Sequence, residues 1–189
     1  RHVLKPDLVH VHDWQAGFVP LLMRHEKLTG GWTNPPPTIV TIHNLAYQGT
    51  FPAWRYTFTN LPWDYFNSNG VEFYGQMNCL KAGIAFADLV TTVSPRYARE
   101  ITTPEFGCGL EGLLQARQNV LVGILNGVDY EEWNTTHNPH LKHPYSVDDF
   151  SGKTANKLDL QKELGLPVDP NIPLFGSITR RADQKRADI

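Results

Sequence analysis

The sequence predicts an α/β protein in which a parallel sheet carries helices on its faces. Two observations support this fold class: short apolar segments without strict polar and apolar alternation, and helical patterns between them. Strands of this kind are buried on both faces, as in a doubly wound sheet. Hydrophobic residues make up 41% of the 189 residues and aromatic residues 11%, which is enough for a packed core.

Five segments have the composition of buried strands. Each is short, apolar and closed by a polar or turn-forming residue. They are residues 7–12, 38–43, 88–93, 120–125 and 172–178. Three consecutive prolines precede the second segment and Asn126-Gly127 follows the fourth, so both have clear boundaries.

Helical patterns occupy the connections between these strands. They cover residues 18–27, 72–86, 95–102, 110–117 and 154–164. Ser94 followed by Pro95 is typical of an N-cap with proline at the first helical position. Gly165 marks the end of the last helix.

The composition excludes several classes of function. Lys and Arg number 17 against 19 Asp and Glu, so the formal charge of −2 leaves no basic footprint for nucleic acid or an anionic membrane. Every long uncharged stretch is interrupted by Pro, Gly, Asn or His, so we expect no transmembrane helix. The first residues, RHVLKP, include no Met and no apolar signal segment. We therefore expect an internal piece of a longer polypeptide.

Cysteine and histidine do not predict a metal site. Cys79 and Cys108 are too few for a disulfide framework and stand in no metal-ligand spacing, which favours a reduced, intracellular setting. The eight histidines form no HExxH pattern. His10 and His12 share one face of the first strand and could hold a metal ion. A structural or substrate-contacting pair is favoured, because no third ligand accompanies them.

The predicted strands end in unusually polar strings. These are HDWQAG from His12, HNLAYQG from His43, VSPRYAREI from Val93 and NGVD from Asn126. The carboxyl ends of parallel strands meet at one edge of a sheet, where active residues gather. Polar groups there suit sugar hydroxyls, and Trp14 and Tyr47 offer flat apolar faces for sugar rings. Taken singly, Asp13 and Asn44 could also be ordinary caps of the following segments.

Taken together, these strings resemble the bacterial glycogen synthase and plant starch synthase family of retaining glucosyltransferases. The resemblance runs through PDLVHVHDWQAG, TIHNLAYQG, LPWDYFN, VSPRYAREITTPEFGCGLEGLLQ and LNGVDYEEWN to ITRRADQK. It implies the two-domain GT-B architecture, with two Rossmann-like domains facing each other across the active site. It also implies transfer of glucose from ADP-glucose to the non-reducing end of an α-1,4-glucan, in glycogen biosynthesis. No metal and no other cofactor is implied.

The resemblance also implies a division of the chain. Residues 1–132 correspond to the C-terminal part of the N-terminal, acceptor-side domain. Residues 133–170 correspond to the crossover between domains and a helix, which agrees with the polar composition of residues 133–152. Residues 171–189 correspond to the start of the C-terminal domain, which binds the nucleotide sugar. We expect the segment alone to be inactive, because the other half of the cleft lies outside it.

Several site residues follow from the same resemblance. His43 matches the histidine that lies beside the transferred glucose, Asp13 matches the carboxylate that shapes the donor and acceptor sites, and Asn126 matches a sugar-binding asparagine. Further candidates for substrate contacts are His12, Trp14, Tyr47 and Gln48.

A basic pair at the end of the chain matches the residues that bind the donor diphosphate. Arg180 and Lys185 would stabilise the charge that develops on the leaving diphosphate. Here Arg181 and Arg186 replace the family's leucine and glycine. A glycine at the second position allows the backbone to approach phosphate closely, and Arg186 puts a bulky cation there.

Other interpretations remain open from the residues alone. A sugar-nucleotide epimerase or a phosphorylase could share the two-domain architecture, whereas an NAD-dependent oxidoreductase would need a GxGxxG string that is absent from the sequence. A catalytically silent glucan-binding segment could use Trp14, Tyr47, Trp54 and Trp63. The sequence does not separate ADP-glucose from UDP-glucose. The expected location is the cytoplasm, or the plastid stroma for a plant protein.

Overall fold

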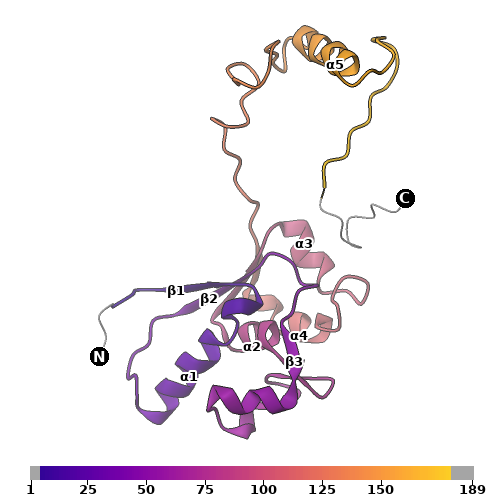
Figure 1. Cartoon of the computed structure of the whole chain (residues 1–189). Helices are drawn as coiled ribbons and strands as arrows, with labels where there is room; N and C mark the ends of the chain where they lie inside the picture. The colour runs from indigo at the N-terminus through magenta and orange to yellow at the C-terminus, as the bar shows by residue number, and fades with distance from the viewer. Residues whose placement is uncertain (1–4, 180–189) are drawn as a thin grey trace. The chain divides into compact units, whose positions relative to one another are not determined.

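The computed structural model describes residues 5–179. The chain forms two compact units, Arg1–Asn126 and Gly127–Ile189 (Figure 1). No helix in the described part of the chain is long and apolar enough to cross a membrane.

A four-stranded parallel sheet forms the centre of the first unit. Its strands are β1 (Val9–His12), β2 (Thr38–Ile42), β6 (Leu89–Thr92) and β7 (Leu121–Gly123), in the order β1-β2-β6-β7. Every neighbouring pair is parallel. The predicted α/β fold and four of the five predicted strands are therefore confirmed, with β7 shorter than residues 120–125.

Helices fill the connections, as predicted at four of five positions. They are α1 (Val19–Thr29), α2 (Cys79–Phe86), α3 (Pro95–Glu100), α4 (Glu111–Ala116) and α5 (Ser151–Glu163). The Ser94 hydroxyl accepts a hydrogen bond from the backbone N–H of Tyr97, as an N-cap does. Gly165, with φ 67°, follows the end of α5. Shorter 3₁₀ helices are η1 (Trp14–Ala16), η2 (Ala53–Thr59), η3 (Trp63–Tyr65) and η4 (Gln118–Val120).

The prediction of one helix over residues 72–86 is wrong in its first half. This half forms strands β4 (Glu72–Phe73) and β5 (Gln76–Asn78), which pair antiparallel with each other and with β3 (Thr50–Pro52). Tyr74 and Gly75 have φ values of 49° and 76°, as a two-residue hairpin turn requires. Asn78 then caps α2 by accepting from the N–H of Lys81. The apolar residues whose spacing suggested one helix are divided between two structures. Phe73 and Met77 lie in the hairpin, and Leu80 and Ile84 lie in α2.

The predicted strand over residues 172–178 is absent. This segment has no regular secondary structure, and Phe175 is 91% exposed. A strand needs a neighbour for its backbone hydrogen bonds, and no strand of the described residues pairs with this segment. The apolar composition of this segment was therefore not sufficient to predict a strand.

The second unit is organised around α5. The side-chain amide of Gln161 is buried and bonds both the carbonyl and the N–H of Asp169, which fixes the chain that follows the helix. Asn156 similarly binds the backbone of His143, which precedes the helix. Polar side chains thus hold this unit where apolar contacts are few.

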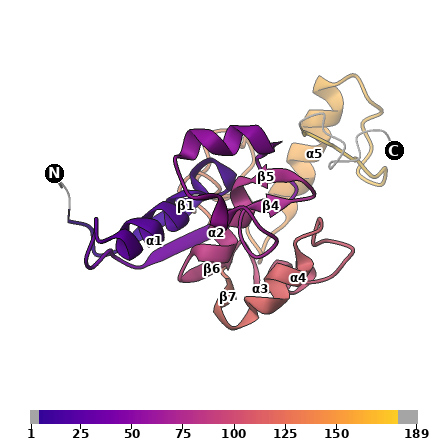
Figure 2. The same ribbon diagram turned by 90° about the horizontal axis from the view of Figure 1, so that it is seen from below.

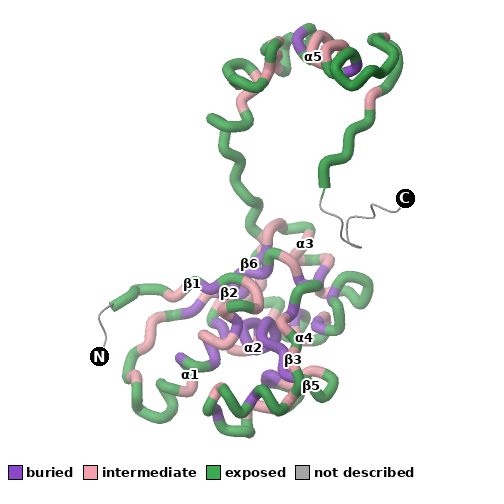
Figure 3. The backbone as a smooth tube through the Cα atoms, in the orientation of Figure 1, coloured by how far each residue is buried: buried purple, intermediate pink, exposed green. Residues whose placement is uncertain are grey.

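The core of the first unit lies between the sheet and α2. Residues Cys79 to Ile84 of α2 are all buried, as the purple helix in Figure 3 shows. Leu80 and Ile84 pack with buried residues of β2 and β6, among them Val40, Ile42 and Val90. Cys79 and Ala82 pack in a second cluster with Leu21 of α1 and Tyr56. Helix α2 also contacts α1 and α4, and α3 packs beside β6 and β7 (Figure 2). The packing of α2 against one face of the sheet thus helps to fix the register of the strands.

Two glycines allow α2 to approach the turn that follows β1. A methyl group on Gly17 would overlap the backbone carbonyl of Cys79, and one on Gly83 would lie 3.2 Å from the carbonyl oxygen of Gly17 and from a methyl group of Val40. A side chain at either glycine would push α2 away from the turn that contains Gly17. This close contact fixes η1, and with it the segment after β1, against the core.

We expect Gly17→Ala to destabilise the protein by about 1–3 kcal/mol, the usual cost of overpacking. The matched control is Gly112→Ala, where a methyl group meets nothing within 4 Å in helix α4. This control is expected to stabilise by about 0.5 kcal/mol through helix propensity. Urea unfolding of both variants measures the difference, and equal stabilities would contradict the close packing.

Candidate functional site

The candidate site lies at the carboxyl edge of the parallel sheet. Asp13 and Trp14 follow β1, His43 follows β2, and Asn126 lies a few residues beyond β7. Since all four strands run in the same direction, these residues leave the sheet at one edge.

His12, Asp13 and His43 are in direct contact. Nδ1 of His12 lies 3.0 Å from Nε2 of His43. The backbone N–H of His43 donates to Oδ1 of Asp13 at 2.8 Å. The last residue of β1 and the residue after it therefore hold the ring and the backbone of the residue that follows β2.

Asp13 has an unusual backbone conformation, with φ 50° and ψ −163°. This region is populated almost entirely by glycine. The conformation is held on both sides: the N–H of Asp13 donates to the carbonyl of Thr41 at 2.9 Å, and its carboxylate accepts from His43. Such a conformation is typical of functional sites, because only surrounding contacts sustain it.

Asn126 shares a cavity with His12. The cavity has a volume of about 260 Å³ and lies over one face of β1, β2 and β6, with residues after β7 closing it. Its polar lining comprises His10, His12, Thr41, Thr91, Thr92 and Asn126. The structure thus brings His12, Asp13, His43 and Asn126 to one region of the sheet edge.

His10 lies next to His12 but makes its own contacts. Its Nε2 lies 2.6 Å from the hydroxyl of Thr41, and that hydroxyl lies 2.6 Å from the hydroxyl of Thr91. Burial lowers the pKa of His10, and the neighbouring His12 and His43 lower it further. His10 is therefore neutral at neutral pH. Within residues 5–179, no group of three or more His, Cys, Asp or Glu is arranged to hold a metal ion.

A second, more open cavity of about 570 Å³ lies beside the HNLAYQG loop. It is lined by Trp14, residues 46–50 and Cys108. The side chain of Tyr47 is 56% exposed, whereas Trp14 is half-buried against Phe51 and the backbone of Gly49. The predicted residues Trp14, Tyr47 and Gln48 are thus together, and Tyr47 offers the more accessible aromatic face.

Gln48 supports this loop from inside. Its residue is only 8% exposed. Its Nε2 donates to the carbonyl of Cys108 at 3.0 Å, and its Oε1 accepts from the side chain of Asn78 at 2.6 Å. Both ends of the amide are therefore already bonded within the protein.

Two supporting residues were not singled out from the sequence. The Asn78 side chain joins Gln48 to the start of α2. The hydroxyl of Tyr97 accepts from the N–H of Leu45 at 3.1 Å, and burial raises the pKa of this hydroxyl. Tyr97 lies in the string VSPRYAREI, so the strand-end pattern contained it without indicating its partner.

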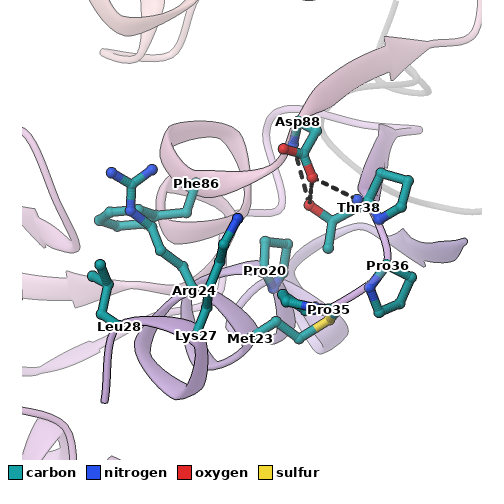
Figure 4. A pocket seen from close by; sticks show the side chains of 11 residues that line it. Pro20, Met23, Arg24, Lys27, Leu28, Pro35, Pro36, Thr38, Phe86 and Asp88 are labelled. Carbon is teal, nitrogen blue, oxygen red and sulfur yellow. Dashed lines mark hydrogen bonds between the residues drawn. The ribbon is translucent and has the colours of Figure 1, made fainter. Parts of the chain in front are cut away.

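A third hollow of about 450 Å³ lies at the opposite edge of the sheet, where β2 and β6 begin. Figure 4 shows Arg24 against the ring of Phe86, with Lys27 beside it. The carboxylate of Asp88 accepts from both the N–H and the hydroxyl of Thr38. Because this carboxylate is already bonded and both cations lie on an exposed helix face, the hollow offers no comparable set of groups for chemistry.

Four residues of the basic string fall outside the described part of the chain. They are Arg180, Arg181, Lys185 and Arg186. Their expected part in diphosphate binding stays a prediction.

Comparison with known proteins gives a consistent result. The family model described as "Starch synthase catalytic domain" matches residues 1–116. A glycogen synthase of Anaeromyxobacter sp. (strain Fw109-5) is 50% identical over 186 residues, covering 98% of this chain and 39% of the relative. Glycogen synthase 2 of Geobacter sulfurreducens is 46% identical over 189 residues, again covering 39% of the relative. The chain therefore spans about two fifths of the length of these curated relatives.

A solved structure is similar as well. The catalytic domain of starch synthase IV from Arabidopsis thaliana, bound to ADP and acarbose, superimposes with a TM-score of 0.73 and 36% sequence identity. The match covers 86% of this chain and 34% of that one.

The backbone of Asp13 gives a testable consequence. Asp13→Ala and Asp13→Gly both remove the carboxylate, but only glycine adopts this conformation without strain. We expect Asp13→Gly to have a free energy of unfolding about 1 kcal/mol higher than that of Asp13→Ala. Chemical denaturation of the two variants measures this difference. The reverse order, with alanine the more stable, would show that position 13 is not strained.

Proposed function

Because the chain belongs to the family of the starch synthase catalytic domain, we propose that it forms part of a retaining glucosyltransferase. The enzyme moves glucose from ADP-glucose to the non-reducing end of an α-1,4-glucan, such as glycogen. The observation that carries this proposal is the contact of His12, Asp13 and His43 at the carboxyl edge of the sheet. We propose that the enzyme acts in the cytoplasm, or in the plastid stroma if it comes from a plant.

The division of the chain follows from the same proposal. Residues 1–132 belong to the acceptor-side domain, residues 133–170 form the crossover and a helix, and residues 171–189 begin the domain that binds the nucleotide sugar. The two-domain GT-B architecture supplies the opposite wall of the cleft.

His43 has the chemistry needed next to the transferred glucose. Breaking the bond between the anomeric carbon and the diphosphate leaves positive charge on the sugar and negative charge on the leaving group. In the described residues His12 occupies Nε2 of His43, so Nδ1 is the ring atom available to a sugar hydroxyl. A ring fixed in this way positions the glucosyl unit for the transfer. Asp13 is the residue directly after His12, and its carboxylate adds negative charge to the same region.

The acceptor glucan lies along the more open cavity. Tyr47 and Trp14 offer aromatic faces to its sugar rings, and Asn126 offers an amide to sugar hydroxyls. Gln48 serves the acceptor indirectly, by holding the loop that carries Tyr47.

A second candidate function is glucan binding without catalysis. It is favoured by exposed aromatic side chains of the first unit: Tyr47, Trp54 and Trp63 are 56%, 59% and 54% exposed. This candidate predicts retention on a glucan column with no affinity for a nucleotide sugar.

The deciding experiment measures transfer of labelled glucose from ADP-glucose into glycogen. It uses the full-length protein that contains this sequence, with primer supplied and UDP-glucose as a competing donor. We expect incorporation, at a higher rate with ADP-glucose. Glucan binding without incorporation from either donor would instead support the second candidate.

We expect His43→Ala to lower kcat at least about a hundredfold, as loss of a group aimed at developing charge does. The free energy of unfolding should change by less than about 1 kcal/mol, since the His43 side chain is exposed. The control is His140→Ala, an exposed histidine of the second unit, which should leave kcat intact. A loss of stability that parallels the loss of activity would assign His43 a structural part instead.

The basic pair has its own test. We expect Arg180→Ala to lower kcat about a hundredfold, because one fixed contact to the leaving diphosphate is lost, worth about 3 kcal/mol in the transition state. Steady-state kinetics of Arg180→Ala and Lys185→Ala with ADP-glucose measure this effect. Activity unchanged in both variants would show that this string does not bind the diphosphate.

A further inference from the structure

Three histidines from two neighbouring strands form a continuous array at the sheet edge. The ring centroids of His10 and His12 are 4.3 Å apart, and those of His12 and His43 are 5.2 Å apart. The parallel register of β1 and β2 sets His12 opposite Thr41, two residues before His43. The array thus follows directly from strand pairing.

The contact between His12 and His43 has a strict requirement. A hydrogen bond between two imidazole nitrogens contains one proton, so one nitrogen must donate and the other must accept. The bond of 3.0 Å between Nδ1 of His12 and Nε2 of His43 therefore links the tautomers of the two rings. Nδ1 of His12, once bonded to His43, is not available to a substrate.

His10 holds His12 from the other side. Its own ring is fixed by Thr41, which in turn contacts Thr91 on β6, so three strands contribute to its orientation. Burial and the two neighbouring imidazoles lower the pKa of His10, which disfavours a positive charge beside the pair. Around the pair lie the imidazole of His10, the Asp13 carboxylate, which bonds the backbone of His43, and Asn126, which lines the same cavity as His12.

We propose that His12 is a positioning residue that orients the imidazole of His43 and selects its tautomer, rather than a residue that binds substrate. Asp13 fixes the backbone of His43 and His12 fixes its ring, so two consecutive residues remove the freedom of a side chain that is otherwise exposed. This inference rests on the proposed glucosyl transfer, because it assigns His43 a place beside the reacting sugar. A displacement of about 1 Å in such a group costs up to about a hundredfold in rate.

Isosteric substitutions test this inference in the full-length protein. The amide of asparagine reaches the position of Nδ1 of histidine, whereas that of glutamine reaches the position of Nε2. We expect His12→Ala and His12→Gln to lower kcat about tenfold to a hundredfold, with the KM for ADP-glucose and for glycogen changed less than about threefold. The kcat of His12→Asn should be about tenfold higher than that of His12→Ala.

A matched control is His25→Ala on α1. Its Nδ1 also contacts a side chain, the hydroxyl of Tyr65 at 3.4 Å, but it lies within a helix and not at a strand end. This variant should keep the wild-type kcat. An increase in KM with unchanged kcat in the His12 variants would overturn the proposal in favour of substrate binding. Equal losses in all three His12 variants, with a matching loss of unfolding free energy, would overturn it in favour of a structural role.

A spectroscopic arm separates this inference from the proposed function. The ¹⁵N chemical shifts of the His43 ring report its tautomer without any substrate. We expect one dominant tautomer in the wild-type protein and in His12→Asn, and a mixture in His12→Ala. This result would uphold the coupling even if the wild-type protein failed to transfer glucose. Identical His43 shifts in wild type and His12→Ala would overturn it even in an active enzyme.

Discussion

The parallel pairing of β1 with β2 is the constraint on which the rest of the site depends. The register that joins Val9 to Thr38 and His12 to Thr41 brings the two strand ends to the same level. Residues 31 positions apart in the sequence then lie within hydrogen-bond distance, as His12 and His43 do. A shift of one residue in this register would turn every side chain of β1 to the other face. Val11 of β1, which is buried with residues of β2 and α2, opposes that shift, because its apolar side chain would be exposed to water.

The loops beyond the strands are fixed by buried polar groups. Gln48, Asn78 and the carbonyl of Cys108 form one set of hydrogen bonds, and Tyr97 with Leu45 forms another. A buried polar group without a partner costs about 1–3 kcal/mol, so each such set favours a single arrangement of the loop. The Trp14 ring, packed over Gly49, adds an apolar contact that allows no side chain at that position. The cavity beside Tyr47 therefore has walls that are held from behind.

The amino-acid pattern predicted most of the fold where one signal dominated. The segments that became β1, β2 and β6 are short, apolar and bounded by polar or turn-forming residues, and each formed a strand of the parallel sheet. The pattern failed where two structures compete for the same residues. Residues 72–86 have helical spacing throughout, yet Tyr74 and Gly75 form a turn that closes a hairpin before Asn78 begins α2. Residues 172–178 have the composition of a strand, but pairing requires a neighbour that composition cannot provide.

The sequence by itself determined which family the chain resembles and which polar residues follow the strands, because strand ends and turn residues are read from local composition. It identified His43, Asp13, Asn126 and the loop with Tyr47, all of which lie near the carboxyl edge of the sheet. Only the tertiary structure decided what these side chains contact. The ring of His12 bonds His43, and the amide of Gln48 is used inside the protein, because both partners come from segments about 30 or more residues away. Such contacts depend on the register of the sheet and on the packing of α2, which no local pattern in the sequence encodes.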